Sequence, residues 1–374
     1  MHEGPRTCVL RTAIVGLGTV AEWHRRGIEN ARGAELVAVA DTDRGRADRV
    51  ATDWGVEGYY DAGTLLAESS VDWVHVCTPV GTHRALAMQC IDHGVPALVE
   101  KPFVLTPAEY EEVMTAADGA GVRVSVVHNQ VFYDPVVEAR RRLAAGEFGT
   151  LHGVSVRWAE DTDPTDSGRG EWVLDLPGGE FGEGVVHPVY TGLRFAGYPA
   201  DEDAVSVSRI ETGGADIEYD GIAVVYRTAD GTACTVQHHS NVPDQRRIDL
   251  VAEDAHITVD IATQSVRVQR NSYGPNAPFE WPLLRAGLDS LFEGTRTAVA
   301  ATREAIAAVA GASATHDTHT PVIEREARAL REGGEGPTPR AEGRWTNHIL
   351  ARINDLPETD GAETNRTETD GMGG

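Results

Sequence analysis

The feature that most constrains this chain is a glycine-containing turn between an apolar, strand-like run and a helix-like run near the N-terminus. The turn reads Gly16-x-Gly18-x-x-Ala21. Gly16 permits the tight bend, Gly18 lets a pyrophosphate approach the backbone, and the small Ala21 allows close helix–strand packing. The first helical residues, Thr19 and Val20, add free N–H groups and a partial positive charge. The pattern predicts a dinucleotide-binding turn.

A second strand-like run, residues 35–40 (ELVAVA), ends at Asp41. This carboxylate lies about 20 residues beyond the glycines, where an acidic side chain is expected to bind the adenosine ribose. Because it would repel a 2′-phosphate, Asp41 favours NAD over NADP. Arg44, three residues on, could bind that phosphate, so NADP remains possible. An ordinary turn followed by an acidic loop is the alternative that these residues leave open.

The order of strand-like and helix-like segments divides the chain into two domains and a tail. Strands alternate with helices through residues 1–128, which predicts a doubly wound parallel sheet of the Rossmann type. Period-two alternation then dominates residues 129–353, which predicts a C-terminal α/β domain with a large, open, mainly antiparallel sheet. Residues 354–374 are acidic and predict a disordered tail. The clearest predicted helices are 44–54, 83–93, 135–145, 285–310 and 321–331.

The overall charge limits the classes of partner that the chain can have. It carries 58 acidic and 33 basic side chains, for a net charge of −25. A field of that sign repels nucleic acid and anionic membranes. It is typical of a protein kept soluble in high salt, so we expect a halophilic source. The sequence has no apolar run near the roughly 20 residues of a membrane span. It also has no signal peptide and no C-x-x-C pair, so we expect a cytoplasmic protein.

Lysine occurs once in the chain, at Lys101; every other basic side chain apart from histidine is arginine. Unlike arginine, lysine can release its proton when its surroundings lower its pKa. Lys101 follows the predicted fifth strand, and ligands of doubly wound sheets bind beyond the carboxyl ends of the strands. A lysine there could donate a hydrogen bond to a substrate oxygen and stabilise charge during hydride transfer.

Several motifs together resemble the Gfo/Idh/MocA family, the relatives of glucose–fructose oxidoreductase and inositol dehydrogenase. The resemblance covers roughly residues 8–353, and its motifs keep the family's order and spacing. The matching pieces are residues 16–21 with His24, 77–83 (CTPVGTH), 100–102 (EKP), 128–135 (HNQVFYDP), and 178–187, which hold two glycines and Glu183-x-x-x-His187.

The resemblance implies roles for individual residues. The second domain of the family usually carries Asp-x-x-x-His on one helix facing the lysine. Here His187 matches as the proton acceptor, Glu183 stands for the aspartate and Tyr190 for a further acid. Lys101, His187 and Glu183 are therefore the expected catalytic residues. The expected cofactor-binding residues are Gly16, Gly18, Thr19, Val20, Asp41, Thr78, Pro79, His83, Glu100 and Lys101, and the expected substrate-binding residues are Asn129, Trp172 and Tyr190.

We therefore expect an NAD(P)-dependent oxidoreductase that acts on a secondary alcohol or carbonyl of a sugar, polyol or related ring. Two alternatives remain: a glycosidase that uses transient oxidation by bound NAD, and a dinucleotide-sensing regulator without catalysis. A homo-oligomer formed through the open sheet is also expected from the resemblance. His316-x-x-His319 lies among polar residues without a third ligand nearby, so we expect no metal site.

Overall fold

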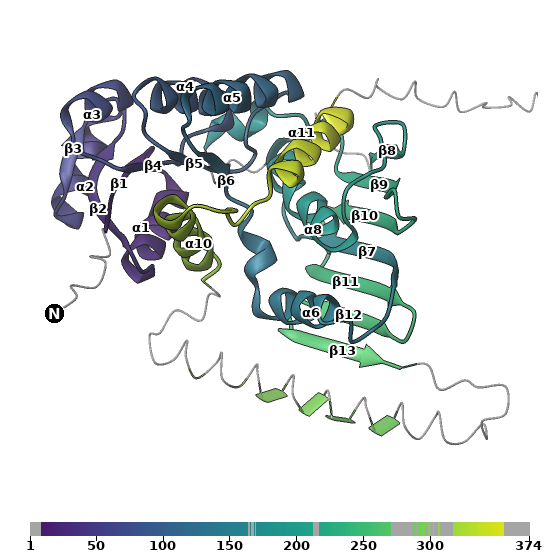
Figure 1. The fold of residues 1–374 in the computed structure, drawn as a ribbon. Coiled ribbons are helices and arrows are strands. Elements are labelled where there is room, and N and C mark those ends of the chain that lie inside the picture. The colour runs from purple at the N-terminus through teal and green to yellow at the C-terminus, as the bar shows by residue number, and fades with distance from the viewer. Residues whose placement is uncertain are drawn as a thin grey trace, which may run out of the picture.

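The computed structural model describes residues 9–163, 165, 168, 170–211, 217–270 and 317–354, with scattered positions between 287 and 306. These residues form two β-sheets, each with its own helices, joined side by side (Figure 1). Among them, no helix is both long and apolar enough to cross a membrane. The predicted tail beyond residue 354 and most of the predicted helix 285–310 lie outside the described residues.

The first sheet has six parallel strands in the order β3-β2-β1-β4-β5-β6. This arrangement confirms the predicted Rossmann-type sheet. Because all strands run in one direction, their carboxyl ends meet at one edge. The strands are β1 (Leu10–Val15), β2 (Ala34–Ala40), β3 (Glu57–Tyr59), β4 (Trp73–Val76), β5 (Ala97–Val99) and β6 (Val124–Val126).

Helices cover both faces of this sheet, because successive side chains of each strand point to opposite faces. Ile14 packs in one buried cluster with Ile28 of the first helix, while Ala13 and Val15 belong to a second cluster. The predicted helix 44–54 is confirmed with the same bounds. The helices are α1 (Thr19–Asn30), α2 (Arg44–Trp54), α3 (Ala62–Glu68), α4 (His83–Asp92) and α5 (Pro107–Ala120), and a short 3₁₀ turn, η1 (Val80–Thr82), precedes α4.

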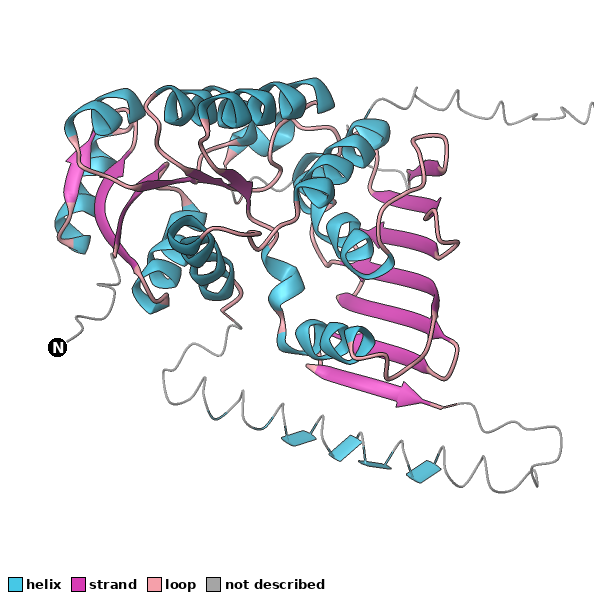
Figure 2. Ribbon diagram, in the orientation of Figure 1, coloured by secondary structure: helices cyan, strands magenta, loops and turns pink. Residues whose placement is uncertain are grey.

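The second sheet has seven strands in the order β13-β12-β11-β7-β10-β9-β8. Only β10 and β7 run parallel, so the sheet is mainly antiparallel, as predicted. In the described chain, helices lie on one of its faces, and the other face is open (Figure 2). The strands are β7 (Leu151–Ala159), β8 (Val205–Ile210), β9 (Gly221–Arg227), β10 (Ala233–His239), β11 (Gln245–Ala252), β12 (His256–Asp260) and β13 (Ser265–Gln269).

The helices of the second half cover one face of this sheet and also reach back to the first one. Helix α8 packs on β7 and β10, α6 on β12 and β13, α10 on α1, and α11 on both α8 and α5. The predicted helices 135–145 and 321–331 are confirmed as α6 and α10. The bounds are η2 (Asn129–Phe132), α6 (Asp134–Ala144), η3 (Glu171–Asp175), α7 (Gly179–Gly184), α8 (Val186–Ala196), α10 (His319–Glu332) and α11 (Arg340–Asn354).

Glu183 and His187 do not share one helix, which departs from the usual pattern of the family that the sequence resembles. Glu183 is the second-last residue of α7, Val185 separates the helices, and His187 is the second residue of α8. Pro188 explains the break. A proline inside a continuous helix lacks the N–H that bonds one turn back, and its ring clashes with that carbonyl. In the first turn of a new helix that N–H has no intrahelical partner anyway, so α8 tolerates Pro188 where it stands.

A buried ion group fastens α11 to α8 and to the start of η2. The Glu342 carboxylate forms two hydrogen bonds with the Arg194 guanidinium, and His128 Nδ1 lies 2.7 Å from it. Burial alone would raise the pKa of Glu342, but the hydrogen bonds from His128 and Arg194 bring that pKa below its ordinary value. Burial lowers the pKa of His128. Arg194 therefore supplies the positive charge, and His128 donates as a neutral ring.

Candidate functional site

The glycine turn after β1 has the shape that a dinucleotide needs. Gly16 has φ +90°, and a Cβ there would lie 2.6 Å from Thr78 Cγ2 and 2.7 Å from the Cys77 carbonyl oxygen. Only glycine fits beside the end of β4. A Cβ on Gly18 would meet no atom within 4 Å, and no side chain caps α1. The helix N-terminus therefore faces open space, where its N–H groups can bind phosphate.

Asp41 follows the end of β2, and its side chain also supports the glycine turn after β1. Its carboxylate accepts hydrogen bonds from the backbone N–H groups of Leu17, at 2.9 Å, and Asp43, at 2.8 Å. The arginine beside it is Arg46, whose Nη1 lies 3.3 Å away. Arg44 instead lies over the Tyr60 ring, 4.5 Å from its centroid. The arginine next to Asp41 is therefore Arg46, and phosphate binding by Arg44 stays a prediction.

His83 ties two strand-end loops together. Its Nε2 lies 2.7 Å from the Thr78 carbonyl oxygen, and its Nδ1 lies 2.9 Å from the Pro102 carbonyl oxygen. The side chain is buried, and this burial lowers its pKa. Thr78 is half-buried and Pro79 exposed at the same edge of the sheet. The structure therefore places His83 behind the edge, where it holds Thr78 and Pro102 rather than facing a ligand.

Lys101 and Glu183 form an ion pair between the two halves of the molecule. Lys101 follows β5 in the loop at the carboxyl edge of the first sheet, and Glu183 lies at the end of α7. Their side chains are 11% and 6% exposed, so little water screens the pair. The structure thus brings the only lysine to the carboxylate that the sequence motif predicted for it.

Behind His187 runs a chain of hydrogen bonds through residues that are distant in sequence. Its Nδ1 lies 2.8 Å from the Tyr190 hydroxyl. That hydroxyl lies 3.3 Å from Asn129 Oδ1 and accepts from the Gln130 N–H at 3.1 Å. Asn129 Nδ2 donates to Thr318 Oγ1 at 3.0 Å, which fixes the direction of the amide.

Counting protons in this chain selects one tautomer of His187. A hydroxyl offers one proton and two lone pairs. If Tyr190 donates its proton to Asn129, its lone pairs accept the Gln130 N–H and a proton on His187 Nδ1. The lone pair of neutral His187 is then on Nε2, which is the state that a general base requires.

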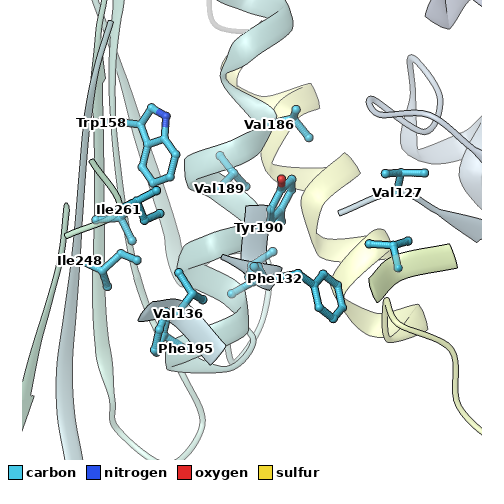
Figure 3. Close-up of a cluster of buried hydrophobic side chains, with 14 of the residues drawn as sticks. Val127, Phe132, Val136, Trp158, Val186, Val189, Tyr190, Phe195, Ile248 and Ile261 are labelled. Carbon is cyan, nitrogen blue, oxygen red and sulfur yellow. The ribbon is translucent and has the colours of Figure 1, made fainter. Parts of the chain in front are cut away.

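Tyr190 is enclosed by protein groups behind His187. Its side chain is fully buried, and burial raises its pKa well above the ordinary value, so the hydroxyl keeps its proton. It lies within the cluster of apolar side chains around α8 (Figure 3). The His128 ring stacks on it at 4.1 Å between centroids. The structure thus places Tyr190 behind His187, and the expected contact between Tyr190 and the substrate stays a prediction.

Two other predicted substrate residues lie in different surroundings. Asn129 begins η2 and is half-buried, with its amide engaged as described above. Trp172 lies in η3 and is also half-buried. Trp158, in contrast, is buried in the core of the second sheet (Figure 3).

Glu100 points away from the sheet edge into the protein. Its Oε2 accepts the Lys101 N–H at 3.0 Å, and its Oε1 lies 2.8 Å from His24 Nε2 and 3.7 Å from His319 Nε2. This geometry differs from the predicted role in binding the cofactor, because both oxygens face protein groups. The three side chains could hold a metal ion. Sequence reasoning missed this group because His319 lies more than 200 residues from its partners.

Comparison with known proteins agrees with this geometry. Residues 10–128 match the family model described as an oxidoreductase family with an NAD-binding Rossmann fold. A D-apiose dehydrogenase of Paraburkholderia graminis is 33% identical over 140 residues, which is 37% of each chain. A scyllo-inositol 2-dehydrogenase (NAD⁺) of Bacillus subtilis is 32% identical over 37% of this chain and 42% of its own. The match thus spans about two fifths of these relatives.

The fold likeness extends further than the sequence match. The WlbA dehydrogenase of Bordetella pertussis, solved with NADH and UDP-GlcNAcA, superposes with a TM-score of 0.72 over 92% of this chain and 94% of its own. The two sequences are 19% identical. This likeness shows that the second sheet, as well as the first, shares the fold of that solved structure.

The open space at Gly18 generates a prediction. Gly18→Ala should leave the melting temperature unchanged but weaken NAD binding by about tenfold or more, because the methyl group would occupy the place of the pyrophosphate. Calorimetric titration with NAD measures the affinity. Gly119→Ala, on α5 and equally free of neighbours, is the matched control. Equal affinity in both variants would mean that the dinucleotide does not bind over this turn.

Proposed function

The chain carries the NAD-binding domain of the Gfo/Idh/MocA oxidoreductase family, and from this premise we propose that it is an NAD-dependent dehydrogenase. Its substrate is a secondary alcohol or the corresponding carbonyl on a sugar, polyol or related ring. Residues 1–128 bind the cofactor and residues 129–353 supply the substrate side of the site. The observation that carries the proposal is the pairing of the sole lysine with Glu183 at the sheet edge that also carries the glycine turn.

In the proposed reaction the protein accepts the proton and the cofactor accepts the hydride. Bound NAD supplies the hydride acceptor. Lys101 donates a hydrogen bond to the reacting oxygen and stabilises negative charge as the C–H bond weakens. His187 accepts the hydroxyl proton on Nε2. Glu183 holds the ammonium group of Lys101 in place, and Tyr190 holds the imidazole of His187 in the required tautomer.

Two other functions are compatible with the fold. A glycosidase that oxidises its substrate transiently would use the same cofactor but return the hydride, so no NADH would accumulate. A dinucleotide sensor would bind NAD without turnover. The buried Lys101–Glu183 pair and the ordered His187 favour a catalyst. The test is a panel of inositols, pentoses and nucleotide sugars, with accumulation of NADH as the readout.

Replacing the sole lysine tests the central role. Lys101→Met should reduce turnover by about 10²-fold or more, because one positioned donor is lost, while NAD affinity stays nearly unchanged. Steady-state kinetics and NAD titration measure the two effects. Arg32→Met, which removes a cation at a 93% exposed position, is the control and should behave like the wild type. Near-normal turnover of Lys101→Met would contradict the proposal.

Tyr190→Phe tests the orientation of His187. Without the hydroxyl, His187 Nδ1–H loses its acceptor, and kcat should fall by about tenfold to a hundredfold. The lost acceptor stabilised the imidazolium more than the neutral ring, so the pKa of His187 should fall. The acid limb of kcat/KM should therefore move to lower pH. Tyr226→Phe, which removes another buried hydroxyl, bonded to the Gly197 carbonyl, is the control. The same pH profile in all three proteins would exclude a positioning role.

Asp41 determines the expected choice of cofactor. We propose that NAD binds more tightly than NADP, because the carboxylate repels a 2′-phosphate. Asp41→Ala should narrow or reverse the preference, since Arg46 would be released to bind the phosphate. Titration with both cofactors measures it. Tighter NADP binding by the wild type would refute the assignment, and adding Arg46→Ala shows whether this arginine causes the change.

The open face of the second sheet is the proposed surface for self-association. It exposes apolar side chains that include Val225, 48% exposed, and Val251, 41% exposed. We propose that the chain forms a homo-oligomer through this face. Light scattering should give a mass above that of one chain, and Val225→Asp combined with Val251→Asp should return it toward the monomer. A monomeric wild type would contradict this proposal.

A further inference from the structure

We propose that His24, Glu100 and His319 form a binding site for one Zn²⁺ ion beneath the Lys101 loop. The three residues come from α1, from the end of β5 and from the start of α10. Each offers one ligand atom, these atoms all lie within 4.8 Å of one another, and all three residues are buried. Imidazole nitrogen and carboxylate oxygen are ligands that zinc prefers.

The distances within the group are compatible with one shared ion. His24 Nε2 lies 2.8 Å from Glu100 Oε1, which is a hydrogen bond. His319 Nε2 lies 3.7 Å from the same oxygen, which is too long for one. Two ligand atoms bound about 2.1 Å from one zinc ion lie roughly 3 to 4 Å apart. Small side-chain rotations would therefore bring all three atoms onto one ion.

The charge of Glu100 supports the same conclusion. The buried glutamates Glu342 and Glu100 differ in the charge of their partners. Glu342 has the permanently charged Arg194 as its partner. In the part of the chain that the structure describes, the ion-pair partners of Glu100 are two histidines, His24 and His319. A buried carboxylate needs a compensating positive charge. A divalent cation held by two neutral imidazoles provides it without protonating either ring.

Each ligand is also held in place by a second contact, as is typical of metal ligands. The other ring nitrogen of His24 lies 2.7 Å from His75 Nδ1. The second oxygen of Glu100 accepts the N–H of Lys101. The His319 ring stacks on Trp23, with 6.2 Å between the ring centroids. Three protein ligands leave one zinc position for water. The ion would join α1, α10 and the loop that carries Lys101.

Zinc binding to the full-length protein tests the site, and it does so whether or not the chain is a dehydrogenase. After removal of metal with a chelator, Zn²⁺ is titrated in competition with a chromophoric chelator, with excess Mg²⁺ present to occupy the acidic surface. We expect one tightly bound ion per chain and a higher melting temperature with zinc. Co²⁺ in the same site should give the visible absorption of a four-coordinate ion.

His319→Gln should raise the Kd for zinc by at least about 100-fold, because a direct ligand is lost, and should abolish the rise in melting temperature. The control is His93→Gln, at an exposed position at the end of α4, which should bind like the wild type. His24→Gln is a second test, with its melting temperature measured without metal to confirm folding. Absence of a stoichiometric tight site, or equal binding by His319→Gln and the wild type, would overturn the proposal.

Discussion

An ion pair between Lys101 and Glu183 joins the two halves of the molecule at the place where the chemistry is proposed. The lysine is fixed by the end of β5, and the glutamate by the short helix α7. That helix has little freedom, because a Cβ at Gly182 would lie 1.9 Å from the Pro177 carbonyl oxygen. The pair therefore depends on close backbone packing as well as on charge, and it aligns the second sheet with the cofactor edge of the first.

The second constraint is the orientation of His187. In one continuous helix, Glu183 would lie one turn before His187 and could be its partner. The helix is broken at Val185, and Glu183 pairs with Lys101 instead. Tyr190 replaces that partner, and the Asn129 amide, fixed by Thr318, determines which way the Tyr190 proton points. An assembly of neutral groups can thus hold a base in one tautomer. His187, Tyr190 and Thr318 are buried, and Asn129 is half-buried, so water screens these hydrogen bonds little.

The sequence predicted the first sheet well because its signals are local. Each signal lies within a short stretch of sequence: an apolar run, a glycine in a turn, or a polar residue at a strand end. Gly16 and Lys101 could therefore be placed at strand ends from their sequence neighbours alone. The surroundings of the other site residues depend on partners that are distant in sequence. Tyr190 was predicted at the ligand, since its burial against His128 is not visible in the sequence. Pro188 explains the break between α7 and α8, but only the fold shows that Glu183 pairs with Lys101 while His187 contacts Tyr190.

The fate of the hydrogen on the substrate carbon tests the central claim most directly. A polyol or sugar substrate carrying deuterium at the reacting carbon, incubated with the protein and NAD, should yield deuterated NADH and a ketone product, with both seen by mass spectrometry. A dehydrogenase that uses Lys101 and His187 as described requires this transfer. Substrate cleavage with the deuterium returned to carbon, or tight NAD binding with no transfer to any polyol or sugar, would contradict the account.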